Sequence, residues 1–197
     1  MQVSYFTPTH NPEHLARLAD SLEAQTCGDY EWIVVPNNGV TAEDVQRLAL
    51  PKACRLRIVE YVGKTLNIGE LKNFAASQGT GQILAEVDHD DELVPECTQE
   101  LISAFESDQS LDFAYSHCLE LADGKSNVYA VSSGWDFVDY VWKGVSHRAC
   151  RSFDPDPKSF CKIWWAPNHV RAWRSSFYHR IGGHDKELRI ADDHDIM

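Results

Sequence analysis

Positive charge is scarce in this chain of 197 residues. It has 18 Lys and Arg residues against 30 Asp and Glu, which gives a net charge of −12. Because phosphate backbones and anionic lipids are bound through Lys and Arg, the sequence argues against general nucleic-acid or anionic-membrane binding. The 43% hydrophobic and 24% charged residues are typical of a globular protein, and the length suffices for one domain with its own core.

Long apolar segments are lacking as well. No run approaches the roughly 20 residues that a membrane-spanning helix needs, and residues 1–8 lack the charged-then-apolar layout of a signal peptide. We therefore expect a cytoplasmic protein without a transmembrane segment. The six cysteines are scattered with no C-x-x-C pair, so we expect free thiols rather than disulfides or a structural zinc site.

What the sequence does contain is a short apolar run that leads straight into carboxylates. Residues 82–87 follow a glycine-rich turn and end at Asp88, Asp90 and Asp91, as a buried strand of a parallel sheet would. Open α/β sheets bind ligands at this end of their strands, and clustered carboxylates need a positive partner. Two interpretations follow: a Mg²⁺ or Mn²⁺ site that also takes phosphates, or the acidic first turn of the next helix.

Predicted strands and helices alternate through the first half of the chain, which indicates a doubly wound, mostly parallel sheet flanked by helices. We therefore predict the α/β class. The predicted strands cover residues 3–7, 32–35, 56–60 and 82–87, and the predicted helices cover residues 12–25, 41–48, 68–77 and 95–105.

The pattern changes after residue 108. Strands are predicted at 112–121, 127–131 and 170–174, and a short helix is predicted to end at the glycines 182–183. Residues 132–167 are rich in aromatic side chains, and we expect them to be irregular. Because a globular chain rarely ends on an acidic motif such as residues 192–195, we expect that the natural protein continues beyond residue 197.

Four motifs, taken together, resemble family 2 of the nucleotide-sugar-dependent glycosyltransferases. The resemblance spans nearly the whole chain, and it depends on the order and spacing of the motifs rather than on any one of them. It implies the GT-A fold, with residues 1–107 as the nucleotide-sugar-binding half and 108–197 as the acceptor and catalytic half of one domain. The motifs are Thr7-Pro8-Thr9-His10-Asn11; residues 31–39; Leu71-Lys72-Asn73 with Gly81 and Asp88-His89-Asp90-Asp91; and residues 174–177 with Ile181-Gly182-Gly183 and residues 191–195.

The resemblance also implies a reaction. A sugar would be transferred, with inversion at its anomeric carbon, from a nucleoside diphosphate sugar to a hydroxyl acceptor such as a glycan. The expected donor is a UDP-sugar. Asp90 would hold Mn²⁺ or Mg²⁺, and Asp88 would contact the metal shell or the ribose, because the leaving diphosphate needs a Lewis acid. The alternative is a non-catalytic sugar-nucleotide or glycan-binding module of the same fold.

The nucleotide would lie beside the ends of the first two strands. Thr7, Pro8 and Thr9 would approach the base mainly through backbone groups. Asn37 and Asn38 stand where the family has an acid that contacts the base, so the identity of the base is open. An Asn amide can bond a uracil edge, and the same two residues also fit a plain turn.

Lys72 has two interpretations on its predicted helix. It either approaches the diphosphate as a point charge or is a solvated cation.

The general base is predicted near the end of the chain. An inverting transfer needs a carboxylate that takes the proton of the acceptor hydroxyl. The resemblance favours Asp193, and Asp192 would replace it if the alignment shifted by one residue; an acidic helical turn is the alternative. We expect His184 to contact neither metal nor acceptor.

The acceptor site is predicted in the aromatic tract. Trp164 or Trp165 would line an acceptor groove, although any single Trp more often belongs to a core. His147, Arg148 and Arg151 add positive charge there, for a phosphate or for a neighbouring carboxylate.

Overall fold

The computed structural model describes residues 1–63, 67–122, 124–126, 136–153, 156–160, 169–190 and 192–196. They form two compact units. The first unit contains Met1–Ala114 together with Ala172–Ile196, and the second contains Tyr115–Arg171. The first unit therefore combines the N-terminal part of the chain with a later segment that ends at Ile196. Within the described residues, no helix combines the length and the apolar character that crossing a bilayer requires.

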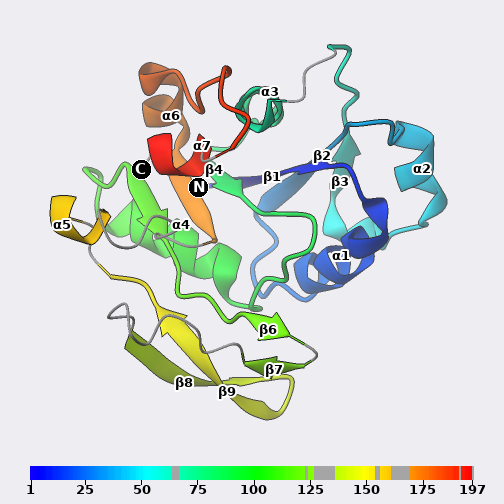
Figure 1. Ribbon diagram of the computed structural model, residues 1–197. Helices are drawn as coiled ribbons and strands as arrows, with labels where there is room; N and C mark the ends of the chain where they lie inside the picture. The colour runs from blue at the N-terminus through cyan, green and yellow to red at the C-terminus, as the bar shows by residue number, and fades with distance from the viewer. Residues whose placement is uncertain are drawn as a thin grey trace. The chain divides into compact units, whose positions relative to one another are not determined.

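A six-stranded sheet forms the centre of the first unit (Figure 1). Its order is β3-β2-β1-β4-β10-β5, and β1 pairs in parallel with both β2 and β4. The predicted α/β fold with a mostly parallel sheet is confirmed. The strands are β1 (Val3–Thr9), β2 (Tyr30–Pro36), β3 (Leu56–Ile58), β4 (Ile83–Glu86), β5 (Phe113–Tyr115) and β10 (Arg171–Arg174).

Helices cover both faces of this sheet, as Figure 1 shows, with α3 and α6 on one side and α1 and α4 on the other. The predicted helices are confirmed, with small changes at their ends. The elements are the 3-10 turns η1 (Pro12–His14) and η2 (Lys52–Cys54) and the helices α1 (Leu15–Glu23), α2 (Ala42–Arg47), α3 (Ile68–Ser77), α4 (Cys97–Ser107), α6 (Ser175–Ile181) and α7 (Asp192–Asp195).

The central strand β1 supplies side chains to both layers, because successive residues of a strand point to opposite faces. Phe6 is fully buried in the cluster that includes Ala75 of α3 and Tyr178 of α6. On the other face, the hydroxyl of Tyr5 lies 3.0 Å from Thr98 Oγ1 of α4. All seven residues of β1 are buried, so the loops that follow the strands start from a rigid base.

The second unit is mostly hairpins. β8 (Asp136–Trp142) and β9 (Val145–Arg151) pair antiparallel through a two-residue turn, and the short strands β6 (Leu121–Ala122) and β7 (Lys125–Ser126) pair likewise. The unit also contains the one-turn helix α5 (Pro157–Phe160).

Two predictions for this part of the chain were wrong. Irregular backbone was expected over residues 132–167, but residues 136–151 of this tract form the β8–β9 hairpin, whose turn residues Lys143 and Gly144 both have positive φ, as a two-residue hairpin turn requires. The strand predicted at 112–121 is broken into β5 and β6. The strand predicted at 127–131 lies outside the described residues.

The cysteines that the structure describes agree with the expected free thiols. None of these five is in a disulfide; they are Cys27, Cys54, Cys97, Cys118 and Cys150.

Candidate functional site

The acidic loop after β4 is separate from the helix that follows it. β4 ends at Glu86, and the backbone N–H of Asp91 donates to the carbonyl of Asp88 at 3.2 Å, which closes a turn. Helix α4 begins only at Cys97. The interpretation of these acids as the first turn of that helix is therefore wrong, and Asp91 does not charge its N-terminus. Asp88 is half-buried and Asp90 is exposed, so the loop presents carboxylates at the carboxyl edge of the sheet.

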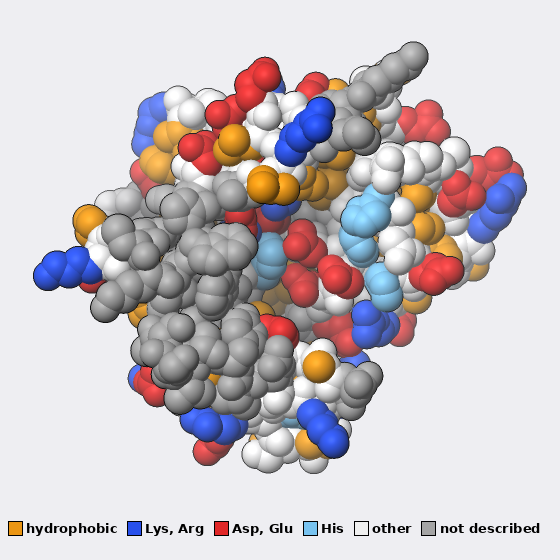
Figure 2. Space-filling model, in the orientation of Figure 1, with side chains coloured by type: hydrophobic (Ala, Val, Ile, Leu, Met, Phe, Trp, Pro, Cys, Tyr) orange, Lys and Arg blue, Asp and Glu red, His pale blue; other side chains and the backbone are white. Residues whose placement is uncertain are grey.

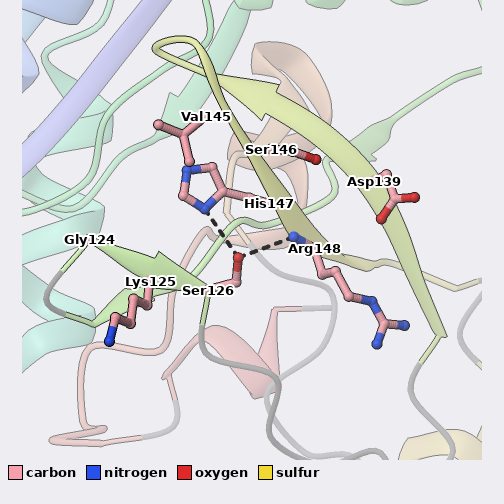
Figure 3. A pocket seen from close by; sticks show the side chains of 8 residues that line it. All are labelled: Gly124, Lys125, Ser126, Asp139, Val145, Ser146, His147 and Arg148. Atoms are coloured by element: carbon pink, nitrogen blue, oxygen red, sulfur yellow. Dashed lines mark hydrogen bonds between the residues drawn. The ribbon is translucent and has the colours of Figure 1, made fainter.

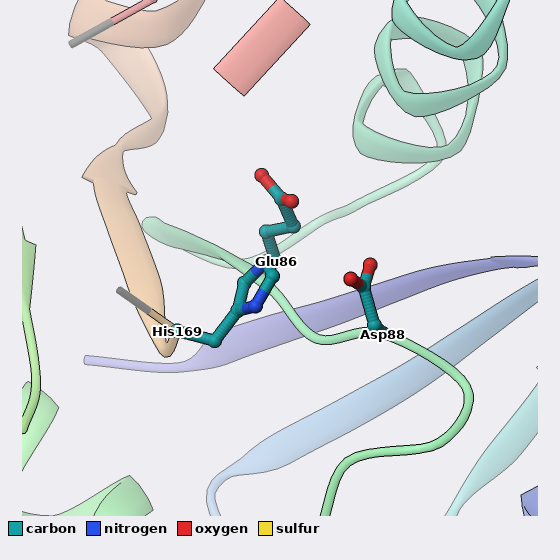
Figure 4. Close-up of side chains that lie close together, drawn as sticks. All are labelled: Glu86, Asp88 and His169. Atoms are coloured by element: carbon teal, nitrogen blue, oxygen red, sulfur yellow. The ribbon is translucent and has the colours of Figure 1, made fainter. Parts of the chain in front are cut away.

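Glu86 adds a carboxylate that the sequence analysis did not single out. Its side chain is fully buried, and it carries a carboxylate oxygen within 4.8 Å of one of Asp88. Figure 4 shows that the two side chains extend to the same side of the chain, as residues two apart on an extended segment do. His169, also drawn there, belongs to the second unit. A lone acid in an otherwise apolar strand was the available sequence signal.

Lys72 of α3 joins two distant acidic segments. Its Nζ lies 2.8 Å from Glu86 Oε1 and 3.1 Å from Asp192 Oδ2. Only 6% of the Lys72 surface is exposed, so the interpretation as a solvated cation is wrong; contact with a diphosphate stays a prediction. Burial alone would lower the pKa of Lys72, but the charges of Glu86, Asp88 and Asp192 raise it above its ordinary value. Lys72 therefore stays charged at neutral pH.

His184 completes this buried cluster. Its Nε2 lies 3.2 Å from Glu86 Oε2 and 3.7 Å from Asp192 Oδ2, and its Nδ1 lies 2.6 Å from the hydroxyl of Tyr178. The rings of Phe6 and Tyr178 are among those that surround it. Burial raises the pKa of Tyr178 well above its ordinary value, so its hydroxyl stays neutral. We refer to Lys72, Glu86, His184 and Asp192 as the buried charge cluster.

Helix α3 contacts the segment of residues 182–185, which precedes Asp192, through hydrogen bonds and close packing. The side-chain amide of Asn73 donates to the carbonyls of Gly182 and His184, at 2.7 and 3.0 Å. Gly69 makes a closer approach, because a Cβ at this position would lie 1.9 Å from the carbonyl oxygen of Asp185. The Asn of the motif Leu71-Lys72-Asn73 therefore has a structural role, because its side chain binds the turn at Gly182 and Gly183.

The two candidate base residues lie differently on α7. Asp192 is 3% exposed and faces Lys72 and His184, whereas Asp193 is half-buried. An acceptor could reach Asp192 only if the buried charge cluster opened. The geometry is therefore compatible with the sequence-based preference for Asp193, whose role stays a prediction.

The hydroxyls predicted near the nucleotide are bonded within the fold. Thr7 Oγ1 donates to the carbonyl of Val87 at 2.9 Å and accepts from Trp32 Nε1 at 3.0 Å. Thr9 Oγ1 donates to the carbonyl of Asn11. Thr7, Pro8 and Thr9 are all buried. Contact with a base through backbone groups, as predicted, stays compatible with these bonds.

The turn after β2 lies beside the end of β1. The backbone N–H of Asn37 donates to the carbonyl of Thr9 at 2.9 Å, and its side-chain amide donates to Val35. Asn38 is exposed and has a φ of 51°, followed by 91° at Gly39. The predicted turn is confirmed, and it places Asn37 at the same sheet edge as the acidic loop.

Three imidazoles that are distant in the sequence meet beside the acidic loop. The ring of His89 lies edge-on to that of His10, with centroids 4.9 Å apart, and stacks on that of His14 at 6.0 Å. Figure 2 shows histidine side chains next to carboxylates on this face of the protein. The sequence analysis missed this contact, because it depends on how the loops after β1 and β4 meet.

The second unit has a cavity of about 390 Å³ that is lined by residues of β7, β8 and β9. Figure 3 shows Ser126 between two residues of β9: its Oγ accepts the backbone N–H of Arg148 at 3.1 Å and lies 3.1 Å from His147 Nδ1. Arg151 pairs with the carboxylate of Asp136 at 3.5 Å. The predicted positive charge is thus partly neutralised by an acid of the same hairpin.

The aromatic residues predicted to line an acceptor groove, Trp164 and Trp165, lie outside the described residues.

Comparison with protein-family models gives one family for this chain. The model for Glycosyl transferase family 2 matches residues 4–132, which include the ends of β1, β2 and β4. No curated protein matches the chain by sequence.

Solved structures with the same fold are also found. Residues 1–349 of TarS from S. aureus, in complex with UDP, match with a TM-score of 0.67 and 18% identity over 98% of this chain and 53% of that one. The mannosyltransferase PcManGT from Pyrobaculum calidifontis, in complex with GDP-Man and Mn²⁺, matches with a TM-score of 0.63 and 20% identity over 98% and 50%. GalNAc-T7 with UDP, GalNAc and Mn²⁺ matches with a TM-score of 0.66 and 13% identity over 100% and 40%. This chain therefore spans about half the length of the TarS fragment, and the likeness shows the GT-A fold.

Proposed function

Because the chain belongs to glycosyl transferase family 2, we propose that it forms the donor-binding and catalytic part of a metal-dependent, inverting glycosyltransferase. The proposed donor is a UDP-sugar, and the proposed acceptor is a hydroxyl group, for preference of a glycan.

One contact carries this proposal. Lys72 Nζ lies within 3.1 Å of both Glu86 and Asp192, so the end of β4 and the acidic turn α7 meet in the first unit. A sugar transfer needs its leaving-group site and its base close together, because both act on one anomeric carbon. A binding module has no such need for the second set of acids.

The donor set of the acidic loop fits a hard divalent cation. Asp88 and Asp90 offer carboxylate oxygens, which Mg²⁺ and Mn²⁺ prefer. Among the described residues, acids outnumber cations here, since the carboxylates of Glu86, Asp88 and Asp192 all act on the ammonium of Lys72. We propose that Asp88 and Asp90 hold Mn²⁺ or Mg²⁺, which when bound offsets the charge that develops on the leaving diphosphate.

The remaining chemistry is assigned to residues of α7. The acceptor oxygen attacks the anomeric carbon from the side opposite the diphosphate. The bond from that carbon to the β-phosphate oxygen breaks, and its electron pair leaves with UDP. The acceptor proton passes to the carboxylate of Asp193, which is more accessible than Asp192.

The choice of uracil rests on Asn37. Its backbone is fixed by the bond to Thr9, and an Asn side chain both donates and accepts, as a uracil edge requires. UDP and UDP-GlcNAc are bound in the TarS structures, whereas PcManGT is complexed with GDP-Man. A comparison of UDP and GDP as ligands of this chain tests the assignment.

Calorimetric titration of UDP tests the donor site. We expect Mn²⁺ to tighten UDP binding by at least tenfold over a titration in EDTA, and Asp90→Ala to abolish this gain. Asp20→Ala, which removes an exposed acid of α1, is the matched control and should bind as the wild type does. Equal affinity with and without metal would contradict the metal role, and tight metal-dependent binding without any sugar transfer would favour the non-catalytic module.

A further inference from the structure

We propose that Lys72 and Glu86 are positioning residues. They hold α7, which carries the proposed base Asp193, in place relative to the acidic loop of Asp88 and Asp90, which we call the metal loop. The inference rests on the proposed function, because it assigns these two side chains a task in that reaction. The proposal assigns Lys72 to α7 rather than to the diphosphate, and the affinity for UDP distinguishes the two roles.

Glu86 is the fixed point of the buried charge cluster. It ends β4, pairs in register with Phe6 of the central strand, and is fully buried. One of its oxygens receives Lys72 and the other faces His184. The position of this carboxylate is therefore set by the sheet. The carboxylate in turn constrains the positions of the side chains that contact it.

Helix α7 cannot fix its own position. It has four residues, Asp192–Asp195, and a single helical turn is unstable by itself because its first hydrogen bond fixes several residues at once. Two residues that hold it are Asp192, in the buried charge cluster, and Ile196, which follows α7 and packs in the apolar cluster. Asp193 is adjacent to Asp192, so we expect its position to shift when the contact between Asp192 and Lys72 is lost.

The buried charges suit this task better than an apolar contact would. Burying an ion pair adds little to stability, because the loss of hydration offsets the attraction. Lys72 nevertheless favours one arrangement of the segments that it joins, because its ammonium attracts the carboxylates of Glu86 and Asp192 at the same time. Lys72 meets Glu86 at 2.8 Å and Asp192 at 3.1 Å, so it sets the separation between the sheet and α7.

The same link reaches the metal loop. Asp88 follows Glu86 by two residues, and their side chains extend to the same side (Figure 4). A shift of α7 away from Glu86 would therefore change the distance between Asp193 and the sugar held by the metal loop. Displacements of about 1 Å at a reacting centre can lower turnover by about 100-fold.

The holding itself is tested without any donor. In Lys72→Met, we expect hydrogen exchange of the amides of residues 192–196 to be at least tenfold faster than in the wild type, while exchange in α4 is unchanged. Lys72→Arg keeps the charge and should restore slow exchange at least in part. Unchanged exchange of residues 192–196 in Lys72→Met would overturn the inference.

Turnover separates positioning from plain stability. UDP-sugars, beginning with UDP-GlcNAc, are first screened with the wild type and Mn²⁺ to find a donor that it uses. With that donor, we expect Lys72→Met to lower kcat by about 100-fold and to leave KM and the Kd of UDP within about threefold. Lys72→Arg should regain part of kcat. A loss of UDP affinity equal to the loss of kcat would overturn the inference and assign Lys72 to the diphosphate.

If Lys72→Met does not fold, the more conservative variant Glu86→Gln tests the same inference. Glu86→Gln keeps the size of the side chain and an oxygen for Lys72, and should lower kcat with KM unchanged; unchanged kcat would contradict the inference. The two proposals fail separately. A wild-type chain without metal-dependent UDP binding would disprove the proposed function, whereas unaltered kcat in both variants would disprove only the positioning role.

Discussion

Lys72 and Asp192 lie 3.1 Å apart, between Nζ and Oδ2, although they belong to α3 and α7 at distant points of the chain. The contact joins the segment after α6 to the helix that precedes β4. Through this contact, α7 and the end of β4 meet in the buried charge cluster of the first unit. We propose that the contact helps to hold the proposed base at a defined distance from the acidic loop that follows β4.

Gly69 allows α3 to approach the segment that carries α7. We expect Gly69→Ala to lower the free energy of unfolding by about 1–3 kcal/mol, because the added Cβ would overlap the carbonyl of Asp185. In an unconstrained helix the same change would be stabilising by about 1 kcal/mol, so the sign is diagnostic. Urea denaturation measures it. Ser103→Ala on the exposed face of α4 is the control, and a stabilised Gly69→Ala would contradict the close approach.

Glu31 gives the fold a defined acid sensitivity. Burial alone would raise its pKa, but hydrogen bonds from Thr80 and Ser4 and the charge of Arg57 lower it below its ordinary value. A carboxyl with a lowered pKa in the folded state adds stability above its unfolded pKa of about 4.3, and this stability is lost as the pH falls through the folded pKa.

The variant Glu31→Gln tests this sign. We expect the wild type to be more stable than the variant at pH 7, and the difference to shrink as the pH is lowered from about 5 toward 3. Chemical denaturation at several pH values measures the difference. Asp20→Asn, at an exposed position of α1, should show no comparable trend. A difference that stays constant or grows toward low pH would contradict the role of these hydrogen bonds.

Much of the first unit could be predicted from the sequence. The buried strands are continuous apolar runs, and Asn11-Pro12 and Thr41 are strong helix-start signals, which the structure uses as caps of η1 and α2. Local chemistry decides these features, so the residues themselves reveal them. The β8–β9 hairpin was missed because its aromatic residues suggested a binding tract, although Lys143-Gly144 was a usable turn signal.

The buried charge cluster could not be predicted in the same way. Glu86 and His184 are 98 positions apart, and nothing in the local sequence of either indicates the other. Lys72 looks like an ordinary surface residue of an amphipathic helix until the packing of α3 is known. The pairing of distant charges depends on tertiary structure, and one sequence carries no direct record of it.

The role of Asp193 gives the most direct test of the account. For Asp193→Asn we expect metal-dependent UDP affinity within about threefold of the wild type and transfer slower by a factor of about 10²–10⁴, the usual contribution of a general base. Asp195→Asn, an exposed neighbour on the same turn, should keep most of the activity. The deciding measurement is UDP release during sugar transfer by the wild type and Asp193→Asn, with Mn²⁺ present; a rate unchanged by the substitution would contradict the account.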